Sequence, residues 1–120
     1  MHGITPDLPL DSFVGKEFNL IGLGRFQIQL HASGTGSLLV EAHWELRDAN
    51  GALIDQAQDH KTRRAYRLHE VIDVPVVDLQ VTPPKSFTFS FEDGHTLTVY
   101  DDEQYEAFSI HLDGEPSLYI

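Results

Sequence analysis

Residues Arg25 to Ile54 read RFQIQLHASGTGSLLVEAHWELRDANGALI, and residues Ser86 to Ile120 read SFTFSFEDGHTLTVYDDEQYEAFSIHLDGEPSLYI. Apolar and polar residues alternate in both stretches, most clearly in RFQIQL and SFTFSF. This period of two is typical of antiparallel strands that bury one face. Asn-Gly and Asp-Gly pairs between the apolar runs predict tight hairpin turns, at Gly51, Gly94 and Gly114.

The same three-strand pattern therefore occurs twice in a single domain of 120 residues, in halves at about 10–54 and 68–120. A polar linker or short helix is expected between them, at 55–70. Three apolar residues of the first half align with three phenylalanines of the second: Phe26, Ile28 and Leu30 with Phe87, Phe89 and Phe91. Neither half is large enough to bury its apolar face alone, so the two faces should pack together.

The predicted fold class is α+β and mostly antiparallel β, with two pseudo-symmetric β-meander halves that form a small barrel or sandwich. One or two short helices are expected, the first ending near Gly15 and placing Leu10, Phe13 and Val14 on one face. Phe18 and Leu20 predict one strand face. A further face is expected at the start of the second half, from Val77, Leu79 and Val81. The run SLLVEAHWEL predicts either one bent strand or two short ones.

Charge and composition exclude several functions. The net charge is −11, which disfavours nucleic acid and anionic membrane surfaces as partners. No apolar run is long enough to span a membrane. The chain has no cysteine, and its first residues lack the pattern of a secretory signal, so a cytoplasmic location is expected.

Motifs for catalysis or metal binding are not evident. The seven histidines have no spacing of two or four residues, which local zinc sites usually use. No nucleophile motif, phosphate-binding loop or complete dinucleotide fingerprint is present. We therefore predict no catalytic, cofactor-binding or metal-binding residues. The sequence does not decide whether the chain is an enzyme, but it favours a non-catalytic protein.

Two charged clusters are candidate interaction sites. Aromatic residues flank an acidic run, and aromatic residues are typical anchors of protein interfaces. The candidate partner-binding residues are Tyr100, Asp101, Asp102, Glu103, Tyr105 and Glu106. A basic cluster holds half of the lysines and arginines, at Lys61, Arg63, Arg64 and Arg67. It predicts either ion pairs within the protein or a phosphate-binding patch that the surrounding negative charge would weaken.

The pattern F-x-I-x-L…S-L-x-V-E-x-x-W-x-L, followed by F-x-F-x-F-E-D-G-x-x-L-x-V-Y-D-x-x-x-Y-E-A-F-x-I, resembles a family of small uncharacterised bacterial proteins. Some relatives resemble the immunity proteins of polymorphic toxins. The resemblance covers about Leu10 to Ile120, and its distinctive side chains are Glu41, Trp44 and the pair Tyr105-Glu106. It implies a class of function and no catalytic residues.

Three functions are compatible with these features. The first is a non-catalytic protein-binding domain, such as an immunity-like inhibitor of a basic toxin. Its partner would be a basic protein, because opposite charge steers association. The second is a ligand-binding or enzymatic barrel with a pocket between the halves. The third is a self-associating module, a homodimer formed through exposed edge strands such as SLYI at the C-terminus.

Overall fold

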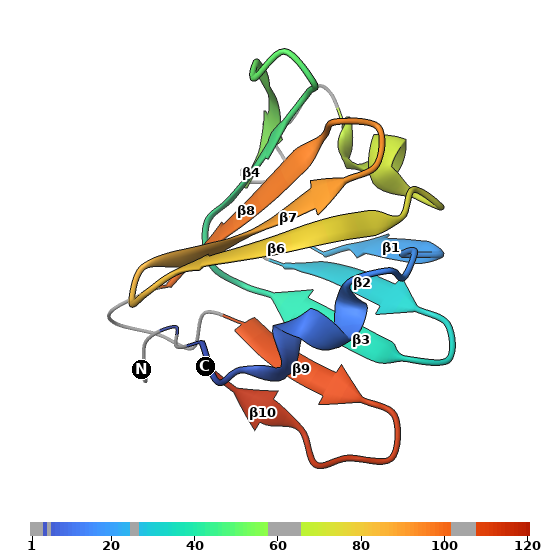
Figure 1. Cartoon of the computed structure of the whole chain (residues 1–120), viewed down its shortest axis with the longest axis vertical. Helices are drawn as coiled ribbons and strands as arrows, with labels where there is room; N and C mark the ends of the chain where they lie inside the picture. The colour runs from blue at the N-terminus through green and yellow to red at the C-terminus, as the bar shows by residue number, and fades with distance from the viewer. Residues whose placement is uncertain (1–3, 5, 25–26, 58–65, 102–107) are drawn as a thin grey trace.

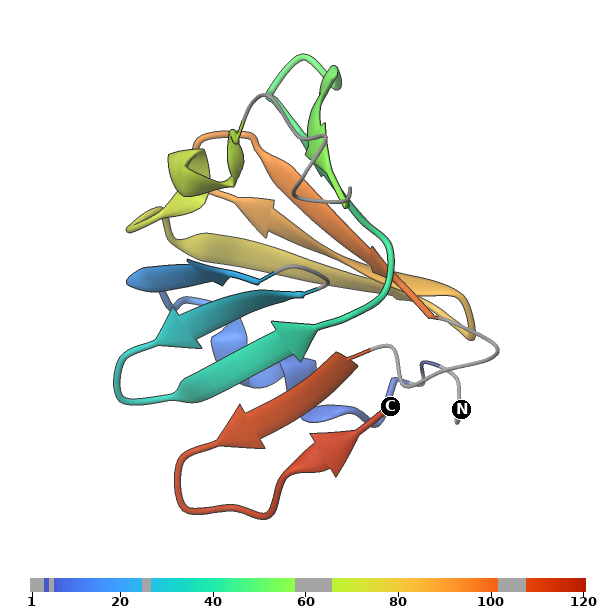
Figure 2. The same ribbon diagram turned by 180° about the vertical axis from the view of Figure 1, so that it is seen from behind.

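The chain folds into two antiparallel sheets of five strands each. The computed structural model describes residues 4, 6–24, 27–57, 66–101 and 108–120. The first sheet has the order β1-β2-β3-β9-β10 and the second the order β5-β4-β8-β7-β6 (Figures 1 and 2). Each described sheet keeps two edge strands, so the fold is a small open sandwich and the alternative of a closed barrel is wrong.

The strands are short and joined mostly by tight turns. In chain order they are β1 Leu20–Leu23, β2 Ile28–Ala32, β3 Gly36–Val40, β4 Trp44–Arg47, β5 Leu53–Gln56, β6 Val76–Thr82, β7 Ser86–Phe91, β8 Thr96–Tyr100, β9 Phe108–Leu112 and β10 Leu118–Tyr119. Two 3-10 helices precede the two sets of strands, η1 Pro9–Phe13 and η2 Leu68–Val71. The three predicted Gly turns have positive φ, at Gly51, Gly94 and Gly114. Within the described residues no helix is long and apolar enough to cross a membrane.

Each sheet combines strands from both halves of the chain. The run SLLVEAHWEL forms two strands, and Figure 2 shows the chain passing from β3 in one sheet to β4 in the other. The second half repeats this crossover between β8 and β9. The strands of the two halves can be matched in chain order, β1 with β6 and so on to β5 with β10. Exchanging each strand for its match turns the strand order of the first sheet into that of the second. Duplication of the sequence itself stays a prediction.

The pairing register corrects the alignment of the two halves. Leu30 pairs with Leu38, and Phe89 pairs with Leu97. The counterpart of Phe89 is therefore Leu30, whereas the sequence pattern assigned Ile28. A shift of two residues keeps the same side chains on the buried face, so a pattern with period two does not exclude it.

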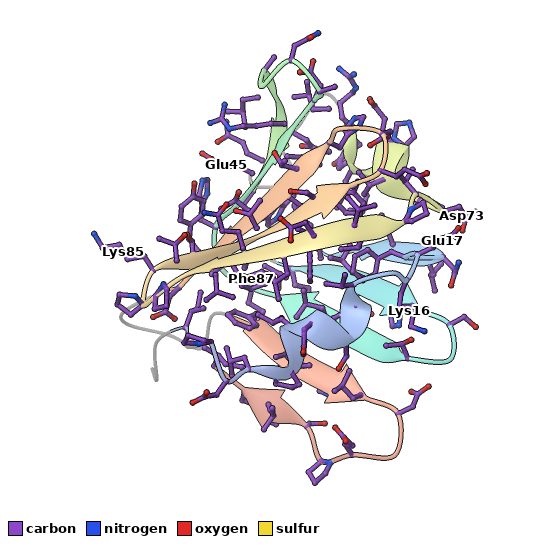
Figure 3. All side chains as sticks on the ribbon, viewed as in Figure 1. Lys16, Glu17, Glu45, Asp73, Lys85 and Phe87 are labelled. Carbon is purple, nitrogen blue, oxygen red and sulfur yellow. The ribbon has the colours of Figure 1, made fainter. Side chains whose placement is uncertain are left out.

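The space between the sheets is filled by apolar side chains. Ile28, Leu30, Phe87, Phe89 and Phe91 are all buried, as the alternation predicts. Phe87 is labelled in Figure 3. Phe26 lies outside the described residues. η1 lies against β6 and places Phe13 6.1 Å from Phe89 of β7, measured between ring centroids. Val14, predicted to share the buried face of this helix, is exposed because the 3-10 helix ends at Phe13. Because the buried side chains occupy the interior, the described residues give no support to a ligand pocket between the halves.

Two predicted strand faces are wrong in part. Phe18 is buried, but Leu20 points to solvent and is 61% exposed. β1 begins at Leu20, so Phe18 lies outside the strand and the two residues do not share a strand face. Val77 is also exposed, whereas its neighbour Val76 is buried. A register shift between Val76 and Asp78 causes this, since a bulge changes which side chains face inward.

The expected polar linker begins within the sheet. Asp55 lies in β5 and is only 4% exposed. Its Oδ2 accepts hydrogen bonds from the backbone N–H groups of Arg67 (2.9 Å) and Leu68 (3.0 Å), and its Oδ1 accepts one from Gln56 (2.9 Å). The carboxylate thus caps η2 from a distant strand, supplying acceptors that the start of a helix lacks.

Candidate functional site

The predicted interaction site begins at Tyr100, at the end of β8 on the outer side of the second sheet. The Tyr100 hydroxyl donates a hydrogen bond to Glu45 Oε1 at 2.9 Å. His43 Nε2 lies 3.3 Å from Glu45 Oε2, and the His43 ring packs 5.3 Å from the Tyr100 ring. Arg47 approaches the same carboxylate at 3.5 Å. The carboxylate of Glu45, a residue labelled in Figure 3, is therefore contacted by all three side chains.

These contacts change the ionisation of two groups. Hydrogen bonds from His43 and then from Tyr100 lower the pKa of Glu45, so its carboxylate stays charged over a wider pH range. Burial of the ring, followed by the hydrogen bond to Glu45, raises the pKa of the Tyr100 hydroxyl. The pair is thus held as a neutral phenol and a charged carboxylate. That arrangement stabilises negative charge at the surface, and a phenol with a raised pKa is poorly suited to give up its proton at neutral pH.

Only part of the predicted site falls within the described residues. Tyr100 and Asp101 are described, whereas Asp102, Glu103, Tyr105 and Glu106 lie outside them. The Asp101 backbone N–H donates to the Lys85 carbonyl at 2.7 Å, which fixes the start of the acidic segment beside the β6–β7 turn.

The crossover from β3 to β4 brings further negative charge to the same edge. The Tyr100 N–H donates to the His43 carbonyl at 3.0 Å, so the end of β8 lies beside the end of the β3–β4 crossover. Glu41, which precedes His43, is exposed. We call this region, defined by Glu41, His43, Glu45, Tyr100 and Asp101, the acidic edge. Glu45 and His43 were not predicted from the sequence, because nothing in the local pattern links β4 to Tyr100.

The described part of the basic cluster is engaged within the protein. Arg67 forms an ion pair with Glu70 in η2, which lowers the pKa of the Glu70 carboxyl. Glu70 also lies 3.1 Å from His95 Nε2. This supports the alternative of internal ion pairs for Arg67. Lys61, Arg63 and Arg64 lie outside the described residues.

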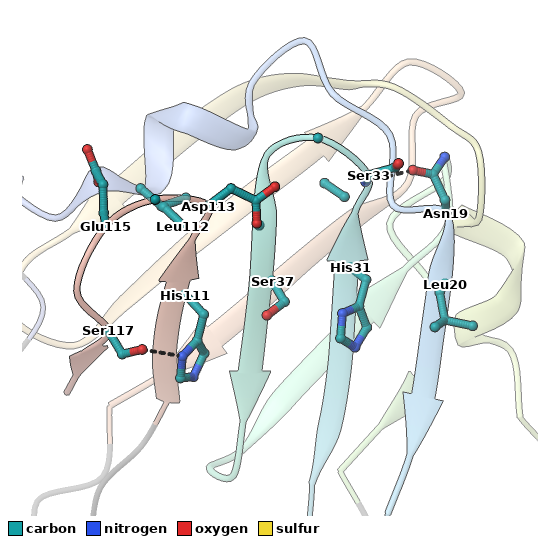
Figure 4. Close-up of a pocket in the computed structure, with 14 residues that line it drawn as sticks. Asn19, Leu20, His31, Ser33, Ser37, His111, Leu112, Asp113, Glu115 and Ser117 are labelled. Atoms are coloured by element: carbon teal, nitrogen blue, oxygen red, sulfur yellow. Dashed lines mark hydrogen bonds between the residues drawn. The ribbon is translucent and has the colours of Figure 1, made fainter.

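A second feature is an open depression of about 500 Å³ on the outer side of the first sheet. Figure 4 shows its floor, where His31, Ser37 and His111 lie in a row across three strands. The register explains the row, because Ser37 pairs with His31 on β2 and with His111 on β9. Polar groups of the β2–β3 and β9–β10 turns form its rim, including Asp113 and Glu115.

A row of hydrogen-bonded side chains, serine–histidine–serine, lies at the depression and was not predicted from the sequence. Ser109 Oγ lies 2.8 Å from His111 Nε2, and Ser117 Oγ lies 2.6 Å from His111 Nδ1. This resembles a nucleophile, a base and an orienting group. However, Ser109 is only 1% exposed, so a substrate carbonyl has no access to its hydroxyl. The hydrogen bonds therefore fix the imidazole and satisfy its two nitrogens. The sequence did contain one signal for this contact: Ser109 and His111 are two residues apart on a strand, and such residues share a face.

No arrangement among the described residues is suited to a metal ion, which would need three or more grouped histidine and carboxylate side chains. Comparison of the chain with models of protein families, with curated proteins and with solved structures found no match.

Proposed function

We propose that this chain is a non-catalytic, cytoplasmic protein-binding domain that recognises a basic partner protein through the acidic edge. The supporting observation is a net charge of −11 together with carboxylates gathered around an aromatic side chain at one edge of the sandwich. The predicted resemblance to immunity proteins implies one form of this function, the inhibition of a basic toxin.

The chemistry of the acidic edge suits arginine and lysine side chains. Glu45 is held charged and oriented, and the half-buried Tyr100 ring lies beside it. A guanidinium group binds carboxylates with two parallel hydrogen bonds and also stacks on aromatic rings. Asp101 Oδ1 is buried and has no hydrogen-bond partner among the described residues, so no donor among them offsets its negative charge beside Tyr100.

The test compares two pairs of charge reversals in affinity purification from a bacterial lysate at low salt. Glu41→Lys with Asp101→Lys alters the acidic edge, and Asp78→Lys with Glu92→Lys alters exposed carboxylates elsewhere by the same charge. We expect the wild type and the control pair to retain a partner of high isoelectric point and the acidic-edge pair to lose it. Binding of the purified partner, measured by calorimetry, should weaken by about tenfold or more as salt rises.

Absence of a basic partner, or equal loss of the partner with both pairs, would contradict the proposal. Equal loss would mean that net charge alone attracts basic proteins, without a defined site.

A further inference from the structure

The strands on the outer side of the first sheet carry no charged residue, although 22% of the chain is charged. None of the strands β1, β2, β3, β9 and β10 contains Asp, Glu, Lys or Arg. The carboxylates of Asp113 and Glu115 belong to the β9–β10 turn at the rim. The side chains that alternate with the buried ones form a surface that we call the neutral face, made of Leu20, Gln29, His31, Ser37, Leu39, His111 and Tyr119. Ser109 shares this alternation but is only 1% exposed. In a chain of net charge −11, such a surface is unexpected for a face that only contacts water.

The polar groups of the neutral face are largely satisfied by one another. His31 Nε2 lies 3.2 Å from Gln29 Oε1, and His111 contacts the hydroxyls of Ser109 and Ser117. Covering a polar group costs free energy when its hydrogen bonds are lost, and groups already paired avoid much of that cost. The neutral face is therefore easier to desolvate than the second sheet, where Glu45, Arg47 and Asp78 carry charge.

The edges of the first sheet are also less protected than those of the second. Four of the eight exposed large apolar side chains among the described residues lie on β1 and β10: Leu20, Leu23, Leu118 and Tyr119. β1 and β10 pair with their neighbours in continuous register, whereas β5 and β6 each show a register shift, and β6 also carries the exposed carboxylate of Asp78. Bulges and charges are the usual means of preventing association at an edge.

We propose that the neutral face binds a second copy of this chain, forming a reversible homodimer about a two-fold axis. Charge complementarity selects this occupant. A basic partner gains nothing from an uncharged surface, whereas two chains of net charge −11 meet with least repulsion where neither presents a charge. Strands about 4.8 Å apart and about five residues long give a face of roughly 20 by 17 Å. A face of about 340 Å² on each copy is less than half of the roughly 800 Å² that a stable interface buries per partner, so the dimer is weak and reversible.

The experiment is sedimentation equilibrium of the full chain up to millimolar concentration, in about 50 mM and about 500 mM salt. We expect the dimer to tighten with salt, because salt screens the residual repulsion between the two acidic chains. Binding of a basic partner at the acidic edge has the opposite salt dependence. A monomer under both conditions, or a dimer that weakens with salt, would overturn the proposal.

Matched variants locate the interface. Ser37→Glu places a charge at the centre of the neutral face, between His31 and His111, and Thr96→Glu makes the same change at the equivalent position of the second sheet. We expect Ser37→Glu to weaken the dimer by about tenfold or more and Thr96→Glu to have little effect. Equal weakening by both would refute the assignment.

A second pair keeps the test valid if Ser37→Glu impairs folding of the central strand β3. Leu20→Lys and Val77→Lys change side chains that are 61% and 52% exposed, so both variants should fold. Only Leu20→Lys, at the border of the neutral face, should weaken the dimer. A dimer unaffected by Leu20→Lys, in a folded protein, would count against the proposed surface.

Discussion

The outer sides of the two sheets occupy equivalent places in the fold but present different chemistry. Where the second sheet has Glu45, the first has Ser109, and where the second has Arg47, the first has His111. The exposed apolar residue Leu20 stands at the position of Asp78. One strand arrangement thus supports a charged surface on one side and an uncharged surface on the other. The buried side chains determine the fold, and the alternating outward positions remain free to differ.

The largest expected effect concerns the core that the two sheets share. Phe89→Ala should lower the free energy of unfolding by about 3–5 kcal/mol, and Leu30→Ala, at the equivalent position, by about 2–5 kcal/mol, because each leaves a cavity. Phe89 lies 5.8 Å from Phe18 and 5.4 Å from Phe87, measured between ring centroids. Chemical denaturation measures both losses.

Thr88→Ala is the control on the outer side of the same strand. Its hydroxyl is only half-buried and lies 2.8 Å from the Thr98 hydroxyl, so its loss should cost about 1 kcal/mol. A larger effect for Thr88→Ala than for Phe89→Ala would show that the faces of β7 are assigned the wrong way round.

An intermediate loss of stability is expected for Asp55→Ala, compared with Leu118→Ala at the equivalent position of the first sheet. Asp55 pairs with Leu46, and Leu118 pairs with Ile110. Asp55→Ala should cost about 2–4 kcal/mol, because it removes the acceptor for the buried N–H of Leu68 and for that of Arg67. Leu118→Ala should cost about 1 kcal/mol or less, since Leu118 is 40% exposed. Thermal unfolding of both variants tests this difference, and similar losses would contradict it.

The smallest expected effect depends on pH. The pKa of Glu45 is lower in the folded protein than its ordinary value of 4.5, so its contribution to stability is present above that value. The contribution is lost as the pH falls through the folded-state pKa. Glu45→Gln should therefore cost about 1 kcal/mol at neutral pH, and the difference from the wild type should shrink below pH 4.5.

Urea denaturation between neutral and acidic pH measures this change. Ser109→Ala, at the equivalent position of the first sheet, is the control, because a hydroxyl does not titrate in the acid range. A difference between Glu45→Gln and the wild type that stays constant down to acidic pH would show that the carboxylate gains nothing from His43 and Tyr100.

Local patterns predicted most of the strands and their buried faces. Alternation in SFTFSF identified Phe87, Phe89 and Phe91 as core residues, because the period of a strand is set by its backbone. Asn-Gly and Asp-Gly pairs identified the turns for a similar local reason. Patterning failed where a bulge or an end of a strand changed the phase, at Val77 and Leu20.

The sequence by itself determined an acidic, mostly antiparallel β protein, since composition, alternation and turn residues are local properties. Only the tertiary structure decided which strands share a sheet, and that the two halves exchange strands. It also brought Tyr100 to Glu45, placed Asp55 under η2, and aligned His31, Ser37 and His111 on one uncharged face. These contacts join residues far apart in the chain, and they depend on strand order and register, which a pattern with period two leaves open.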